Sequence, residues 1–314
     1  MSTHLESAPT VLVIGATGRH GRTGSTVVDG LLSRNSAVRV LTRTDDDRAA
    51  ELRRRGATTV VGDLHDRGSL LAAVDGVDAI YFTYPVAAGV IPAAANLASA
   101  ILHSERRPHV VVMSMVASAH GSPSKLGQAQ AVAEDVLSWA GLNPTVLRIA
   151  GLFQENVLLV HGDSIRRDGL IINSFGDGRA PWIGGRDSAE LAVAELLKPA
   201  PPATVITYPP SVEALSHAEI ADIISAETGR PIDYRAVSYQ EWKALLEQQS
   251  DTESGPVNKA MAQHISIIGA AFAAGKGPVV TPDPTALTAA LGHQPATFAD
   301  FVHEHRLEFG ASNA

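Results

Sequence analysis

Short, continuously apolar segments alternate with amphipathic segments over the first 150 residues. Strands without polar alternation are typical of a parallel sheet that is buried on both faces. Segments at helical spacing between them, such as the one that carries Val27, Val28, Leu31 and Leu32, predict covering helices. The expected strands are at 11–14, 38–41, 60–61, 79–83, 109–113 and 145–149, and the further helices at 51–55, 69–74, 93–103 and 128–140. The pattern predicts an α/β fold with a doubly wound parallel sheet.

The alternation weakens after about residue 150, where groups such as 176–178 and 199–202 are rich in glycine or proline. One clear helix follows, because Ser216 and Glu219 form a capping box and Gly229 ends the apolar stripe. The polar residues 248–256 predict a loop. We expect a first domain over 1–150 and a smaller C-terminal α/β domain built mainly from 151–314, with some segments returning to the sheet.

A glycine-rich segment over residues 15–24 follows the first strand and opens the first helix. A tight strand-to-helix turn needs glycine, and the missing side chains let backbone N–H groups approach a diphosphate at the helix N-terminus. In this strand–loop–helix context the segment predicts a dinucleotide site in a sheet of the Rossmann type. A glycine turn without a ligand is the alternative. The expected contacts are Gly15, Thr17, Gly18, Arg19, His20 and Gly21.

Two registers of this motif overlap, because glycine recurs at every third position from residue 15 to residue 24. The register Gly15-Gly18-Gly21 lies closest to the strand. The register Gly18-Gly21-Gly24 has the usual spacing to the apolar residues of the helix. We favour the first register, with three additional residues that lengthen the turn.

The end of the second strand bears on which dinucleotide binds. An NAD-selective site places a carboxylate there for the ribose 2′-hydroxyl. This strand ends with Arg43, about twenty residues past the loop, and an arginine can pair with a 2′-phosphate. NADPH or NADP+ is therefore expected, and NAD(H) is the alternative. An ordinary surface role for Arg43 and the acidic run 45–47 are the counterarguments.

The composition excludes several other classes of protein. The 314 residues contain no cysteine, so disulfides, thiolate metal sites and thiol nucleophiles are absent. The net charge of −8 gives no basic footprint for nucleic acid. No apolar run has the ~18 residues of a membrane helix, and the polar first nine residues do not form a signal peptide. We expect a soluble, cytoplasmic protein.

Motifs along most of the chain resemble the NmrA-like group of atypical short-chain dehydrogenases/reductases. They are the Gly-Ala-Thr-Gly loop, VLTR at 40–43, VGDL at 61–64, GVDA at 76–79, LRIAGLFQEN at 147–156, Arg-Asp at 186–187 and TFADFV at 297–302. Each is weak alone, but their order is specific. The resemblance implies a Rossmann domain that binds NADP(H) and a small C-terminal substrate domain.

The resemblance also implies roles for residues at the ends of the strands. Asp63 and Leu64 would line the adenine pocket, although Asp63 could simply cap a turn. Ser114 and Met115, after the fifth strand, would face the reaction cleft. The nicotinamide side would contain Thr83, Tyr84 and Pro85, and the wall towards the substrate Phe153 and Asn156. Asp187 fits a helix cap better than a catalytic group.

The tyrosine–lysine pair that tunes proton transfer in alcohol-oxidising members is missing from the helix that should contain it. Gln130 stands where related members often have lysine. Tyr239 and Lys243 have the right spacing but lie far past the sheet, so we interpret them as the start of an ordinary helix.

Histidines and one tryptophan are the remaining candidates. His120 and His161 are weak candidates for a proton donor, and hydrogen-bonded loop histidines are the simpler interpretation of both. The sequence 303–305, His-Glu-His, lacks the i, i+4 spacing of a metal site, so no metal is expected. Trp182 fits a substrate pocket and a core position equally well.

Two functions remain open. The first is an NADPH-dependent oxidoreductase that transfers hydride to a small electron-poor acceptor such as a quinone, an azo compound or an activated alkene, since these need orientation more than acid catalysis. The second is a non-catalytic NADP(H) sensor that acts through a protein partner. We favour the enzyme, because no segment of the sequence is typical of a partner-recruiting tail. A small-molecule substrate is expected, and a homodimer is possible in either case.

Overall fold

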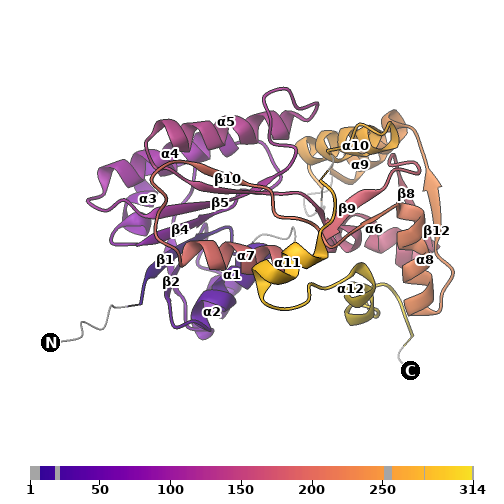
Figure 1. The fold of residues 1–314 in the computed structure, drawn as a ribbon, viewed down its shortest axis with the longest axis horizontal. Helices are drawn as coiled ribbons and strands as arrows, with labels where there is room; N and C mark the ends of the chain where they lie inside the picture. Colours follow the sequence, from indigo (N-terminus) through magenta and orange to yellow (C-terminus); the bar gives the residue numbers. More distant parts are fainter. Residues whose placement is uncertain (1–7, 18–21, 251–256, 279, 313–314) are drawn as a thin grey trace.

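A computed structural model describes residues 8–17, 22–250, 257–278 and 280–312 (Figure 1). The strands are β1 (Thr10–Ile14), β2 (Ala37–Thr42), β3 (Thr58–Val61), β4 (Ala79–Phe82), β5 (His109–Met115), β6 (Thr145–Ile149), β7 (Leu152–Phe153), β8 (Leu170–Asn173), β9 (Ala180–Ile183), β10 (Val205–Thr207), β11 (Glu213–Leu215) and β12 (Asp233–Ala236). The helices are α1 (Thr23–Leu32), α2 (Asp47–Arg54), α3 (Arg67–Val74), α4 (Val90–His103), α5 (Lys125–Trp139), α6 (Glu155–Asp168), α7 (Gly185–Leu196), α8 (His217–Thr228), α9 (Tyr239–Ser250), α10 (Lys259–Ala273), α11 (Pro284–Leu291) and α12 (Phe298–Glu304).

Seven strands form one sheet in the order β10-β6-β5-β4-β1-β2-β3, and every neighbouring pair is parallel. The order reverses between β1 and β4, so this is a doubly wound sheet of the Rossmann type, as the alternating pattern predicts. Helices α3, α4 and α5 cover one face, and α1, α2 and α7 cover the other (Figure 1). Ligands of such sheets bind beyond the carboxyl ends of the strands at the point of reversal.

Two apolar cores lie on the two faces of this sheet. Val13 of β1 packs with Val27 of α1 and Val193 of α7, whereas its neighbour Leu12 packs with Leu97 of α4 on the other side. Successive side chains of a strand point to opposite faces, so a strand that is buried on both faces must be apolar throughout. This explains why the first strands can be recognised in the sequence.

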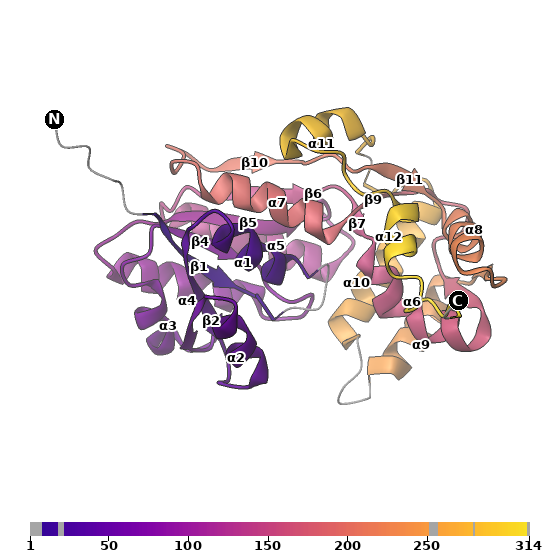
Figure 2. The ribbon, with the colours of Figure 1, turned by 90° about the horizontal axis from the view of Figure 1, so that it is seen from below.

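The rest of the chain forms a smaller region around a three-stranded sheet, β11-β9-β7, and a two-stranded sheet, β12-β8. Helices α6, α8, α9, α10 and α12 surround these strands (Figure 2). We refer to this part as the small-sheet region. Its core is rich in aromatic rings, among them Phe175, Trp182 and Phe298. Three later segments belong to the large sheet instead: β10 extends its edge, and α7 and α11 pack on the α1 face.

Some boundaries differ from the expectation. Ser114 and Met115 lie within β5 and not after it, because the strand continues its pairing with β6 as far as Met115. Residues 248–250 are the last turn of α9, so the loop predicted from residue 248 was wrong there. Asp187 does not cap α7; it lies in the first turn and accepts a hydrogen bond from the backbone N–H of Ala296 at 3.1 Å.

Among the described residues, no helix is both long enough and apolar enough to cross a membrane. Within the same part of the chain, no three His, Cys, Asp or Glu side chains are grouped as metal ligands.

Candidate dinucleotide and acceptor sites

The turn after β1 requires glycine at residue 15. Its φ of 89° lies in the left-handed region, which side chains rarely adopt. A Cβ atom there would also lie 2.9 Å from the carbonyl oxygen of Thr83, which follows β4. The turn and the end of β4 are therefore in direct contact, at the point where the strand order reverses.

Gly24 is the second glycine with a defined role. A Cβ atom on Gly24 would lie 2.7 Å from the carbonyl carbon of Gly15 and 2.8 Å from Cα of Ala16. Helix α1 approaches the β1 turn this closely only because residue 24 has no side chain. Gly15 begins one register of the motif and Gly24 ends the other, so these two glycines leave the register open. Gly18, Arg19, His20 and Gly21 lie outside the described residues.

The N-terminus of α1 has no side-chain cap and no acidic residue in its first turn. By contrast, Asp46 caps α2 and Asp66 caps α3. The positive end of the α1 dipole is therefore not neutralised by a carboxylate of its own helix. Thr17, a predicted contact, lies in the turn that leads to this helix end.

Tyr81 links β4 to the start of α1, and the sequence analysis did not identify it. Its phenol O–H donates to Oγ1 of Thr23 at 3.0 Å, and the ring is fully buried. Burial raises the pKa of this phenol, so Tyr81 stays neutral, and its hydrogen bond joins β4 to the first residue of α1. Inside an apolar strand, a tyrosine gives no sequence signal that separates it from a core residue.

Three polar side chains gather at the ends of β2, β3 and β4. Burial raises the pKa of the Tyr84 phenol, the Asp63 carboxylate raises it further, and the Arg43 guanidinium opposes both. Asp63 accepts a hydrogen bond from the backbone N–H of His65 at 2.9 Å, so it does stabilise a turn. Nε2 of His65 and the Tyr84 hydroxyl share a hydrogen bond of 2.8 Å.

Two of the three aspartates in the acidic run 45–47, which follows Arg43, form ion pairs with other arginines. Asp45 pairs with Arg53 at 2.7 Å, and Asp46 caps α2 and pairs with Arg48. Arg43 itself is exposed. Leu64 contacts the apolar core through its side chain and accepts a hydrogen bond from Asn96 through its carbonyl, whereas Pro85 is exposed.

A large hollow of about 820 Å³ lies beside the β1 turn, between α1 and α2 on one side and α6 and α12 on the other. We call it the arginine hollow, because it is lined by Arg22, Arg48, Arg54, Arg55, Arg166 and Arg186. Thr17 and Glu155 also line it. Burial raises the pKa of Glu155 to about 7, although hydrogen bonds from its own backbone N–H and from the backbone N–H of Gly185 lower it.

A smaller cavity of about 100 Å³ lies inside the small-sheet region. We call it the aromatic cavity. It is lined by Val86, Leu152, Asn156, Val157, Val160, His161, Phe175, Trp182, His217, Trp242, Met261, His264, Ile265 and Ile268. Three predicted residues, Asn156, His161 and Trp182, therefore meet here. Phe153 does not line the cavity and packs instead against the core on the α1 face.

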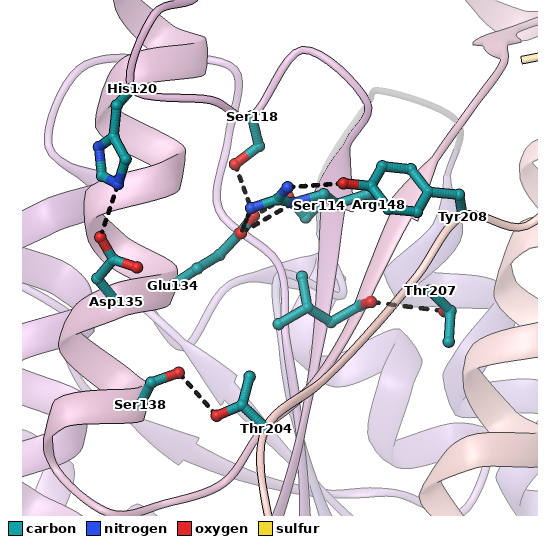
Figure 3. A network of polar contacts seen from close by, with 11 residues as sticks. Ser114, Ser118, His120, Glu134, Asp135, Ser138, Arg148, Thr204, Thr207 and Tyr208 are labelled. Atoms are coloured by element: carbon teal, nitrogen blue, oxygen red, sulfur yellow. Dashed lines mark hydrogen bonds and ion pairs between the residues drawn. The ribbon is translucent and has the colours of Figure 1, made fainter.

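The Ser114 hydroxyl, which the resemblance places at the reaction cleft, takes part in a buried polar cluster and lines neither hollow. Its hydroxyl donates to the buried carboxylate of Glu134 on α5, which also accepts from Ser118 at 2.8 Å (Figure 3). Arg148 of β6 pairs with the same carboxylate through Nε at 3.0 Å and Nη2 at 2.6 Å. Arg148 also donates to the Tyr208 hydroxyl at 2.8 Å. This cluster fastens α5 to the ends of β5 and β6.

His120 and Gln130, the other two weak candidates for a catalytic residue, line neither hollow. His120 is largely exposed and pairs with Asp135 at 3.0 Å on the outer side of α5 (Figure 3). Gln130 is buried on α5 and lines neither hollow. Tyr239 and Lys243 open α9, as expected, and do not line the aromatic cavity either.

The chain is similar to known proteins in both sequence and fold. The model of the NmrA-like family matches residues 7–276. The NAD(P)H azoreductase of Xenophilus azovorans is 32% identical over 312 residues, which cover 96% of this chain and 100% of the relative. Two solved structures share the fold at 21% identity and a TM-score of 0.77. The NADPH complex of the Escherichia coli quinone oxidoreductase QOR2 matches 94% of this chain and 99% of its own. The NADP(H) complex of the Citrobacter triphenylmethane reductase has the same coverage. The match to the family model and the 32% identity to the azoreductase establish that this chain belongs to the NmrA-like family.

Proposed function

We propose that this protein is an NADPH-dependent reductase that transfers hydride to a small electron-poor acceptor. The observation that carries the proposal is the β1 turn at the reversal of strand order, where Gly15 and Gly24 bring an uncapped helix N-terminus against the strand end. The relative over the whole chain is named an NAD(P)H azoreductase, and two of the structural neighbours are reductases, one of quinones and one of triphenylmethane dyes. Another neighbour is NmrA, a negative transcriptional regulator that was solved with NAD and with NADP, and it keeps the sensor as the second candidate.

The residues present fit a dinucleotide. The first-turn N–H groups of α1 suit a diphosphate, and a Cβ atom on Gly15 or Gly24 would close the approach. Arg43 is the candidate for the 2′-phosphate, since Asp45 and Asp46 beside it are paired with other cations. This favours NADPH over NADH. Asp63 and Arg43 both act electrostatically on the Tyr84 phenol, and Asp63 and Tyr84 would line the adenosine half.

When bound, the dihydronicotinamide supplies a hydride, which carries two electrons and one proton, and a solvent proton completes the reduction of a quinone to a hydroquinone. The chain itself orients the acceptor and excludes water. Helix α5 contains no tyrosine that could donate a proton. Its buried Glu134 forms an ion pair with Arg148 and does not donate one either. Acceptors that need little acid catalysis fit this arrangement, namely quinones, azo compounds and activated alkenes.

Calorimetric titration with NADP+ and NAD+ tests the cofactor assignment. Arg43→Asp should weaken NADP+ binding by roughly 100-fold, which corresponds to about 3 kcal/mol, because a charge pair is replaced by repulsion. NAD+ binding should be nearly unchanged. Arg34→Asp makes the same charge change at the opposite end of α1, where Arg34 bonds the Gly30 carbonyl, and should leave both affinities alone. Equal loss of both dinucleotides in Arg43→Asp would contradict the 2′-phosphate role.

Stopped-flow oxidation of NADPH with a panel of quinones and azo compounds tests the reaction. Turnover of at least one class is expected. Tight NADP+ binding without turnover of any acceptor would contradict the reductase and favour the sensor of cofactor state.

A further inference from the structure

The aromatic cavity lies among flat rings. His161 of α6 stacks on Trp242 of α9, with ring centres 5.3 Å apart and planes 20° apart. His217 lies 4.4 Å from the Phe175 ring and 5.6 Å from the Trp182 ring, centre to centre. Such walls favour a flat, unsaturated ligand, since stacked and edge-to-face contacts add to the apolar burial.

In two of the residues that line the cavity, a buried polar atom has no partner. Nδ1 of His217 and Nε1 of Trp242 are buried without a hydrogen bond, in residues that are each 3% exposed. Comparable groups close by are satisfied: Nε1 of Trp182 donates to the Leu215 carbonyl at 3.2 Å, and the Tyr234 hydroxyl donates to Asn173 at 2.9 Å. An unsatisfied buried group costs about 1–3 kcal/mol, so two of them beside one cavity point to a ligand. An indole N–H can only donate, and the matching ligand atom is therefore an acceptor.

The cavity is electrically neutral. None of the described residues that line it is Lys, Arg, Asp or Glu. Burial lowers the pKa of His161 to about 4. Burial also lowers the pKa of His217 well below its usual range, and the neighbouring imidazole of His161 lowers it further. A sulfonate or carboxylate would lose its hydration there without gaining a counter-ion, which is strongly unfavourable.

The size and position of the cavity further restrict which ligands it can bind. An engineered cavity of about 150 Å³ accommodates benzene, so a cavity of about 100 Å³ takes at most one ring, and only after its walls move apart. Val86, four residues past β4, lines the same cavity, and Asn258 at the start of α10 bonds its carbonyl at 2.9 Å. The cavity thus reaches the carboxyl edge of the large sheet, where the cofactor site is proposed.

We propose that the aromatic cavity binds one uncharged ring of the hydride acceptor, with Nε1–H of Trp242 donating to a carbonyl oxygen or equivalent acceptor atom on that ring. His217 is the second polar contact, through Nδ1. Uncharged single-ring carbonyl compounds are therefore the preferred acceptor class, and rings with a sulfonate or carboxylate are excluded. This inference rests on the proposed reductase function and specifies its acceptor.

Binding can be tested without turnover, with acetophenone as an uncharged carbonyl probe, benzoate as its charged analogue and ethylbenzene as an analogue without an acceptor. The chain has three tryptophans, so the indole N–H signals of the ¹⁵N-labelled full-length protein can be assigned by single substitutions. Acetophenone should shift the Trp242 signal and leave that of the exposed Trp139 in place. Benzoate should shift neither signal.

Trp242→Phe keeps a ring and removes the N–H. It should weaken acetophenone binding by roughly fivefold, the range of one hydrogen bond, and leave ethylbenzene binding unchanged. Trp139→Phe is the matched control and should change neither; His217→Phe, which removes the second contact, should also weaken acetophenone selectively. Benzoate binding as tight as acetophenone, or an unmoved Trp242 signal at saturation, would overturn the proposal. If quinones are reduced while acetophenone leaves Trp242 unaffected, the reductase stands and the cavity assignment fails; if acetophenone binds as expected without turnover of any acceptor, the reductase fails.

Discussion

The buried ion pair between Glu134 and Arg148 offers the sharpest test of what holds the large sheet to α5. Its side chains are only 4% and 16% exposed, and the carboxylate also accepts from Ser114 and Ser118 (Figure 3). Glu134→Ala leaves a guanidinium in a largely dry site without its counter-ion. Two serine hydroxyls lose their acceptor at the same time.

Removing one partner of a buried pair typically costs about 3–5 kcal/mol, because the remaining charge stays desolvated. We therefore expect Glu134→Ala to lower the free energy of unfolding by about 4 kcal/mol. An unfolding entropy of about 2.1 cal/mol/K per residue over 314 residues gives roughly 0.66 kcal/mol/K. The melting temperature should then fall by roughly 6 °C.

Differential scanning calorimetry on the full chain measures this change. Asp135→Ala is the matched control on the next residue of α5, where a carboxylate pairs with the exposed His120, and it should shift the melting temperature by less than about 2 °C. The double variant Glu134→Leu with Arg148→Met removes both charges and should recover most of the loss. If Glu134→Ala melts like Asp135→Ala, or if the double variant is less stable than Glu134→Ala, the reasoning about desolvation is wrong.

Two further predictions concern the glycine turn and the buried histidine. Gly24→Ala places a Cβ atom against the Gly15 backbone. It should reduce the free energy of unfolding by about 1–3 kcal/mol and weaken NADP+ binding, which calorimetry measures. Gly121→Ala is the control, because a Cβ atom there meets open space, and it should change neither quantity. His161 has a pKa of about 4 in the folded protein and about 6.5 unfolded, so only the unfolded chain gains a proton as the pH falls from 6.5 towards 4. The free energy of unfolding should therefore fall by roughly 2 kcal/mol between pH 7 and pH 5, and the urea midpoint should fall with it. His161→Leu should remove that part of the loss, and an unchanged pH dependence in this variant would contradict the assignment.

The first half of the fold is predictable because its signals are local. Strands that are buried on both faces are apolar at every position, and β6 occupies the expected 145–149 without change. The helix from His217 to Thr228 was also recognised, because its capping box and its terminal Gly229 lie within the segment itself. Strands β7 and β9 gave no such signal. They have two and four residues, β9 contains Pro181, and the pairing of Leu152 with Trp182 joins residues thirty positions apart.

The sequence predicts the glycine turn, because a local backbone motif defines it, but it gives no signal where side chains meet across the fold. Gly15 could be found from the strand before it, and the spacing to Val27 was the available signal for Gly24. Trp242 lies between Tyr239 and Lys243, in the segment that we interpret as an ordinary helix start, and α9 does start there. Nothing in that segment alone indicates that Trp242 lines a cavity. No local pattern links His217 to His161, which are 56 residues apart in the sequence and have ring centres 6.1 Å apart in the fold.

Helix α6 shows why the second half resists pattern analysis and how the two hollows are kept apart. Glu155, Leu158 and Leu159 line the arginine hollow, whereas Val157, Val160 and His161 line the aromatic cavity. Each set follows helical spacing on its own side, so the helix has two interior stripes and no single apolar face. Among the described residues, the two hollows share no lining residue. Helix α6 therefore separates a hollow that is lined by charged side chains of both signs from a cavity whose described lining contains no Lys, Arg, Asp or Glu. If the proposed acceptor site is correct, substitutions on the cavity side of α6 should change acceptor binding without changing the affinity for NADP+.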